Sequence, residues 1–262
     1  MTAVLSSITR AGRFEPFELQ VARGQIMGHT AVTVFGYNPD VDTAEEAIWP
    51  NGGTIPHVTT ASILKISSSS INDTAAGTGA RTVYISGVDG NYNTVSETVT
   101  LNGQTAVNTV NSYIALNQFY TATVGSTGYN EGNINAGTGT VTAGVPAVLY
   151  DLIGATNNNR TTAHYVVPAG YTAYLLMGMF TAGQASGSTN VIGKLESFNP
   201  ADSIVRVAAV ATLNNGSVQY DFIAPIAFSE KTCVGAVATG SSVNNSVSTV
   251  FNMILIKNDG QS

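Results

Sequence analysis

Side chains able to act as acids, bases, nucleophiles or metal ligands are few in this chain and lie far apart. Its 262 residues include three histidines, His29, His57 and His164, and a single cysteine, Cys233. A catalytic or metal site requires several such groups in a defined geometry, and none of the histidines has a second histidine or a carboxylate at metal-ligand spacing. We therefore expect no catalytic residue, no metal, no cofactor and no enzymatic activity.

One stretch, Asp89–Asn93 (DGNYN), has residues that match the first three ligand positions of a calcium-binding loop. Thr94 stands where such a loop has its turn glycine, and Thr100 where it has a bidentate glutamate. Turn-forming residues produce the same match without an ion. We interpret the stretch as a hairpin turn.

Clustered carboxylates occur at one place, Glu45–Glu46. Glycosidase chemistry requires two carboxylates about 5 to 10 Å apart in a cleft, but this pair lies in a polar stretch that we interpret as a short helical turn or a solvated loop. The sequence has no G-x-S-x-G elbow, phosphate-binding loop or dinucleotide fingerprint. Hydrolytic and phosphoryl-transfer chemistry therefore have no support.

Glu97 alternates with Val95 and Val99 along an expected strand. Either its carboxylate points into an apolar layer, where it needs a partner or a raised pKa, or this side of the sheet is exposed. Arg81 and Lys65 are the candidate partners.

The amino-acid composition limits the kinds of partner that the chain can bind. Charged residues make up 10% of the chain, against roughly 25% in an average soluble protein. The net charge of -6 arises from 16 acidic and 10 basic residues without a basic cluster, which argues against nucleic-acid binding. The most apolar stretches, such as Tyr174–Phe180, are far shorter than the roughly 20 residues that span a bilayer, so no membrane partner is expected.

The single Cys233 excludes an internal disulfide and suits a chain made in a reducing cytosol, where it would be a small buried hydrophobe. The opening MTAVLSSITRAGRFEPF lacks the continuous apolar core and cleavage site of a secretory signal. We expect synthesis in the cytoplasm without export by that route.

Short runs rich in Val, Ile, Thr and Tyr, separated by Gly, Asn and Ser, predict an all-β protein. In the first half we expect strands at 63–67, 82–88, 94–101 and 119–124, with a short helix or an irregular crossover at Asn111–Gln118. A polar linker is expected at Gly154–Thr162. Beyond it we expect strands at 164–167, 173–180, 191–197, 203–213, 219–222, 232–239 and 246–256, with the turn Asn214–Gly216 joining two of them as a hairpin.

This spacing predicts two β-sandwich domains, at 51–153 and 163–262, the second resembling a jelly roll. Residues 1–50 differ, because their large apolar side chains have no hairpin partner set. They are either an extended arm that buries these side chains in a neighbouring subunit, which we favour, or a first strand and loop of the nearer domain. The candidate partner-binding residues of the arm are Phe14, Phe17, Leu19, Val21 and Ile26.

Four segments carry a resemblance to a known family. Pro16–Val41 and Ser67–Val107 (SSSSINDTAAGTGARTVYISGVDGNYNTVSETVTLNGQTAV) resemble virion structural proteins of tailed bacteriophages. His164–Gly178 (HYVVPAGYTAYLLMG) and Pro225–Thr232 (PIAFSEKT) are similar to the β-sandwich module that ends many such proteins. The likeness covers most of the chain but does not specify a place on the particle.

The resemblance implies a capsid decoration or cement protein on the outer capsid surface of a virion. Its partners would be the major capsid protein and copies of itself in a homotrimer, with the arm clamping neighbouring capsid subunits. The alternative is a tail- or collar-associated fibre or host-recognition module that holds a glycan on Tyr171, Tyr174 or Tyr220. A depolymerase is a more distant third.

Overall fold

The computed structural model describes residues 15–56, 58, 60–184 and 190–258. In this part of the chain the regular structure consists of sixteen strands and one short helix, α1 (Phe17–Ala22). All strand pairings between them are antiparallel. The all-β class expected from the sequence is confirmed.

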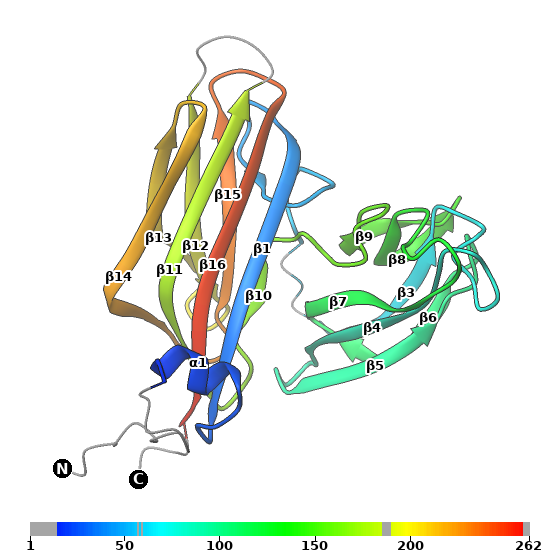
Figure 1. Cartoon of the computed structure of the whole chain (residues 1–262), viewed down its shortest axis with the longest axis horizontal. Helices are drawn as coiled ribbons and strands as arrows, with labels where there is room; N and C mark the ends of the chain where they lie inside the picture. The colour runs from blue at the N-terminus through cyan, green and yellow to red at the C-terminus, as the bar shows by residue number, and fades with distance from the viewer. Residues whose placement is uncertain (1–14, 57, 59, 185–189, 259–262) are drawn as a thin grey trace.

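Two sheets form what we call the larger body (Figure 1). One has the order β1-β16-β11-β14, with bounds His29–Val41, Asn245–Lys257, Tyr171–Gln184 and Gly216–Phe228. The other has the order β10-β15-β12-β13, with bounds His164–Val166, Cys233–Gly240, Val191–Asn199 and Ile204–Leu213, and β2 (Glu46–Ala47) also pairs with β15. A shared hydrophobic cluster that includes Phe180, Leu195 and Phe251 holds the two sheets together.

Two further sheets form the smaller body beside it (Figure 1). One has the order β6-β3-β8-β9, with bounds Val107–Tyr113, Ser62–Ser68, Ile134–Thr142 and Val145–Ile153. The other has the order β5-β4-β7, with bounds Thr94–Thr100, Ala80–Val88 and Ala115–Val124. Its cluster includes Ile66, Tyr113 and Phe119. Because these strands follow β2 and precede β10, the smaller body interrupts the chain of the larger one.

Side chains and backbone groups join the two bodies. The Asn117 amide of β7 donates to the Val166 carbonyl at 2.8 Å and accepts from the Val166 N–H at 2.9 Å, so it acts as a strand partner for β10. The Ala169 N–H donates to the Tyr92 carbonyl at 2.8 Å. Around these bonds a separate hydrophobic cluster includes Val88, Ile114 and Val166. Contacts of this kind hold the bodies at a defined spacing.

The structure changes the account of residues 1–50. Residues 1–14 lie outside the described part, and His29–Val41 forms β1, which pairs with β16 from His29↔Ile256 onward. Residues 29–41 are therefore a strand of the body built by the C-terminal half, not an arm. The sequence pattern did not reveal this because the partner strand lies more than 200 residues away.

Two connections also differ from expectation. Residues 111–118 form neither a helix nor an irregular crossover: β6 ends at Tyr113 and β7 begins at Ala115, because Tyr113 and Leu116 bury their side chains in the smaller body. The turn Asn214–Gly216, expected to close a hairpin, connects β13 to β14, which belong to different sheets. Asn215 allows the change of direction with a φ of 47°.

Candidate functional site

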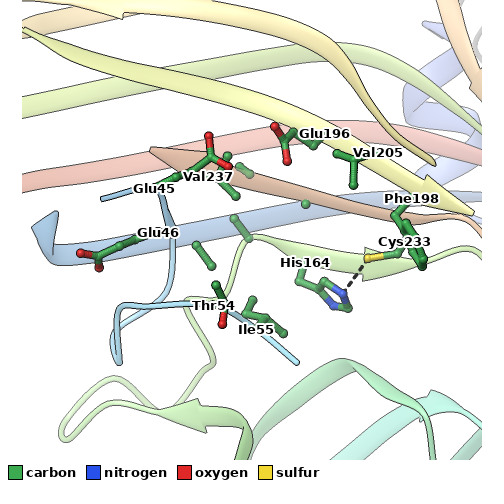
Figure 2. A pocket seen from close by; sticks show the side chains of 14 residues that line it. Glu45, Glu46, Thr54, Ile55, His164, Glu196, Phe198, Val205, Cys233 and Val237 are labelled. Carbon is green, nitrogen blue, oxygen red and sulfur yellow. Dashed lines mark hydrogen bonds between the residues drawn. The ribbon is translucent and has the colours of Figure 1, made fainter. Parts of the chain in front are cut away.

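A cavity of about 200 Å³ lies on the outer side of the sheet that contains β10, β15, β12 and β13, under the segment that carries β2. It contains the chain's one cysteine, one histidine and three carboxylates. Among the residues that line it, Figure 2 labels Glu45, Glu46, Thr54, Ile55, His164, Glu196, Phe198, Val205, Cys233 and Val237.

His164 and Cys233 point toward each other from β10 and β15, with Nε2 and Sγ 2.9 Å apart (Figure 2). Their strands are adjacent in register, since His164 pairs with Gly235 and Val166 with Cys233. Burial raises the pKa of the Cys233 thiol to about 12. The thiol is therefore protonated near neutral pH, whereas a cysteine nucleophile requires a lowered pKa. The expectation that Cys233 is buried is confirmed.

Two of the three carboxylates of the cavity, those of Glu45 and Glu46, have structural partners. Lys194 Nζ lies 2.5 Å from Glu45 Oε2. Glu46 accepts hydrogen bonds from the Asn38 amide at 3.2 Å and from the Gly53 N–H at 3.0 Å, which fold the loop after β2. Burial, and secondly the charge of Glu45, raises the pKa of Glu196. The pair Glu45–Glu46 thus spans the start of β2, not a helical turn, and organises a loop.

Glu97 has backbone and phenol partners, and neither Arg81 nor Lys65 is among them. Its carboxylate accepts from the Val110 N–H at 2.8 Å, the Asn111 N–H at 2.9 Å and the Tyr113 hydroxyl at 3.0 Å. Burial, and secondly the bond to Glu97, raises the pKa of Tyr113. Glu97 therefore ties β5 to β6 across the edge between two sheets.

Arg81 and Lys65 use their charged groups elsewhere: Arg81 donates to the Gly77 carbonyl at 3.1 Å and Lys65 to the Gly139 carbonyl at 2.7 Å. The possible calcium loop is a turn in which the Asp89 carboxylate accepts from the N–H groups of Asn91 and Asn93 at 2.8 and 2.9 Å. Both observations assign local structural roles.

The candidate arm residues fall into three groups. Phe14 lies outside the described residues, as does His57. Phe17 and Leu19 of α1 are 45% and 46% exposed, and the Phe17 ring contacts His29 edge to face at 5.9 Å between centroids. Val21 is 2% exposed and therefore packs within its own chain, while Ile26 is partly exposed. A partner can reach Phe17 and Leu19 but not Val21.

Two buried charged residues with several partners each were not identified from the sequence. Arg160 and Asp151 form a buried ion pair, and the guanidinium also donates to the carbonyls of Leu116, Thr162 and His164 at 2.7, 3.1 and 3.0 Å. Burial raises the pKa of the Asp151 carboxyl, and the charge of Arg160 opposes this rise. The Asn-rich composition around Arg160 predicts a solvated linker, so no local signal identifies the pair.

Among the described residues no group of three or more His, Cys, Asp or Glu side chains is placed to hold a metal ion. No helix of the described part is both long and apolar enough to cross a bilayer. The cavity of Figure 2 can hold a small apolar group, but its thiol, its imidazole and the carboxylates of Glu45 and Glu46 are committed to contacts that stabilise the fold.

No protein-family model and no curated protein matches the chain. Among solved structures, the chain is similar to the VP2 subviral particle of infectious bursal disease virus, with 10% identity and a TM-score of 0.24 over 89% of this chain and 73% of that one. The Gx strain of the same virus gives 11% identity and a TM-score of 0.21, over 87% and 77% of the two chains. TM-scores at this level do not establish a common fold, and no functional conclusion follows from them.

Proposed function

We propose that the chain is a structural protein of a tailed-phage virion, of the capsid decoration or cement type, that holds neighbouring capsid subunits together through its N-terminal segment. Its partners are then the major capsid protein and copies of itself in a homotrimer on the outer capsid surface, after synthesis in the host cytoplasm. The proposal includes that the chain is not an enzyme and acts without cofactor, metal or nucleic acid.

The strand order of the larger body is the observation that carries the proposal. Eight strands in the orders β1-β16-β11-β14 and β10-β15-β12-β13 have the connectivity of a jelly roll, into which the smaller body is inserted after β2. Jelly rolls recur in viral capsid domains and in lectins. Because a fold alone does not assign a function, the likeness of the sequence to virion proteins selects the first of these two classes.

The attachment surface follows from α1. Val21 and Gln20 are buried and anchor the helix to the larger body, while Phe17 and Leu19 on the same helix remain half-exposed. Residues 1–14, with Phe14, precede this point. When a neighbouring subunit covers Phe17 and Leu19, the burial of their apolar surface stabilises the complex.

The scarcity of charge supports the same mode of contact. With 10% charged residues, the chain has little electrostatic attraction for a partner, so adhesion rests on apolar burial repeated over many copies. Such contacts are not screened by salt. Binding to particles should therefore persist in 1 M NaCl.

The test uses particles that lack this protein. The double variant Phe17→Asp, Leu19→Asp should fold normally, because both side chains are half-exposed, but should no longer cosediment with the particles. Ile71→Asp, at a position 71% exposed on the smaller body, is the matched control and should cosediment like the wild type. Full binding by the double variant would refute attachment through α1.

Copy number distinguishes cement from a tail part: hundreds of copies per particle indicate cement and about a dozen indicate the tail or collar. This alternative, a host-recognition module, is favoured by one observation, a polar groove between the two bodies. Tyr171 lines that groove, whereas the Tyr220 hydroxyl donates to the Val210 carbonyl at 2.5 Å and Tyr174 lies mid-strand opposite Ile254. Of the three tyrosines considered from the sequence, Tyr171 is the one placed to meet a ligand.

A further inference from the structure

Two adjoining cavities of about 200 and 350 Å³ form a groove between the larger and the smaller body. They share Thr33 from β1 and Asn117 and Gln118 from β7. β1 forms one wall and β7 the other, and Figure 1 shows these strands on facing sides of the two bodies. We call this space the interbody groove.

The interbody groove has almost no charge. Its lining consists of hydroxyl, amide, aromatic and aliphatic side chains, and Arg160 is its single charged residue among those described. The Arg160 guanidinium is buried and paired with Asp151, so it is not available to a ligand's anion. A charged ligand would lose hydration in the groove without gaining a counter-charge. The lining therefore favours a neutral polar ligand.

The backbone of β1 adds hydrogen-bonding groups at fixed positions. The Gly28 carbonyl, just before β1, points toward β16 and accepts from the Lys257 N–H. The Tyr37 N–H points away from β16 and donates to the Thr161 carbonyl. Because backbone groups alternate sides along a strand, Thr33 and Phe35 share the direction of Tyr37. Their N–H and C=O groups face the groove and provide both donors and acceptors to a ligand.

Aromatic side chains stand on both walls. Tyr120 is 38% exposed, and its ring packs on Tyr84 with centroids 5.0 Å apart, which limits its rotation. Phe35 on the opposite wall is 47% exposed. The electron-rich face of an aromatic ring attracts the weakly positive C–H groups of a sugar ring while the sugar hydroxyls bind amides. Gln118 is exposed in the groove and offers such an amide.

The segment 158–161 limits how long a peptide strand could pair with β1. At its upper end residues 158–161 already occupy the position between the bodies, since Thr121 donates to the Asn158 carbonyl at 2.8 Å and Tyr37 to that of Thr161 at 3.0 Å. A strand added to β1 would collide with this segment beyond Phe35. The groove therefore suits a compact ligand.

We propose that the interbody groove binds a short neutral oligosaccharide, held by the aromatic rings of Tyr120 and Phe35, the Gln118 amide and the backbone of β1. The walls are set before binding, because the Asn117–Val166 amide bonds fix the spacing of the bodies. A preformed site of this kind avoids part of the ordering cost of association. The site is separate from α1 and serves the protein at any position on the particle.

The experiment uses the full chain on a printed array that carries neutral gluco-, galacto-, manno- and N-acetylglucosamine oligosaccharides, together with sialylated and sulfated glycans. The strongest neutral oligosaccharide is then titrated calorimetrically, alongside the peptide acetyl-VTVTV-amide. Tyr120→Ala and Gln118→Lys should each weaken its binding at least tenfold. Tyr129→Ala, at a position 43% exposed on the smaller body and outside the groove lining, should bind like the wild type.

Gln118→Lys keeps the test decisive if Tyr120→Ala does not fold, because the Gln118 side chain is exposed and its replacement creates no cavity. The proposal is overturned if no neutral oligosaccharide binds, if only charged glycans or the peptide bind, or if both groove variants retain wild-type affinity. These results leave attachment through α1 unaffected, so failure here and failure of the cement proposal are distinguishable.

Discussion

Arg160 Nε lies 2.8 Å from Asp151 Oδ2, and both side chains are almost fully buried. Nε makes no aligned hydrogen bond, so the contact is an ion pair, while the other guanidinium nitrogens donate to carbonyls. Those carbonyls belong to Leu116 of the smaller body, to His164 of the larger body, and to Thr162 just before it. Asp151 lies at the end of β9. The pair therefore fastens the two bodies where the chain passes from one to the other.

Asp151→Asn is expected to destabilise the fold by about 3 to 5 kcal/mol, because it leaves the buried Arg160 cation without its counter-charge. The Thr162 hydroxyl donates to Asp151 Oδ1 at 2.6 Å and can donate to the amide oxygen of asparagine instead. The loss of stability therefore measures the removal of the negative charge. Urea unfolding followed by circular dichroism measures the change in free energy of unfolding.

The control is Asp202→Asn, which breaks the exposed ion pair with Arg206 and should leave the urea midpoint nearly unchanged, since exposed pairs contribute little. Equal effects of the two substitutions would show that the buried pair adds no more than the exposed one. That outcome would remove the basis for the fastening role of Arg160.

Strands were predictable from the sequence where buried apolar side chains alternate with side chains on the opposite face of the sheet. The expected strand 191–197 corresponds to β12 (Val191–Asn199), and 246–256 to β16, because apolar residues such as Leu195 and Phe251 recur at every second buried position. β8 was missed, since its Gly, Asn and Thr content resembles that of turns. β9 (VPAVLYDLI) was missed as well, and the proline at its second position interrupts the strand pattern. Pairing between distant strands, as between β1 and β16, leaves no mark in a local pattern.

The site was less predictable than the strands. Phe17 and Val21 are both apolar residues of one segment, yet the helical turn of α1 exposes the first and buries the second. The interbody groove could not be predicted from the sequence, because Thr33 and Gln118 are ordinary strand residues. They lie close together only because of how the two bodies pack. The sequence shows which side chains are polar or apolar, but it does not predict which residues of the other body lie opposite them.

Asp73 is a second buried carboxylate, and its partners are donors rather than a cation. It accepts from the Ser68 hydroxyl at 2.6 Å and from the N–H groups of Ala80, Glu131 and Gly132 at 2.7 to 2.9 Å. Asp73→Asn replaces one acceptor oxygen by a donor that faces N–H groups. We expect a loss of about 3 kcal/mol, because bonds to a charged group contribute about 1.5 to 3 kcal/mol each.

The measurement for Asp73 is thermal unfolding, with the exposed Glu18→Gln as the matched removal of a carboxylate charge. Glu18→Gln should change the midpoint by a small amount, since its site is the first turn of a short helix. A midpoint for Asp73→Asn as high as that of Glu18→Gln would contradict the role of Asp73 in closing the loops between β3, β4 and β8.

Cys233 leads to a prediction about pH. Burial raises its pKa to about 12 in the folded protein, above the roughly 8.5 of a thiol in an unfolded chain. Between these values the unfolded chain loses the thiol proton while the folded protein keeps it. The stability that this group contributes is therefore complete below about pH 8.5 and falls by about 1.4 kcal/mol per pH unit as the pH rises toward 12.

Cys233→Ala removes this slope, although tyrosines with raised pKa values still titrate in both proteins. The difference in free energy of unfolding between wild type and Cys233→Ala should be constant from pH 6 to 8 and should then shrink by more than 1 kcal/mol between about pH 9 and 10.5. Urea unfolding at each pH measures it. A difference that stays constant to pH 10.5 would mean that the native thiol ionises as readily as an exposed one, and Cys233 would then have to be reconsidered as a reactive group beside His164.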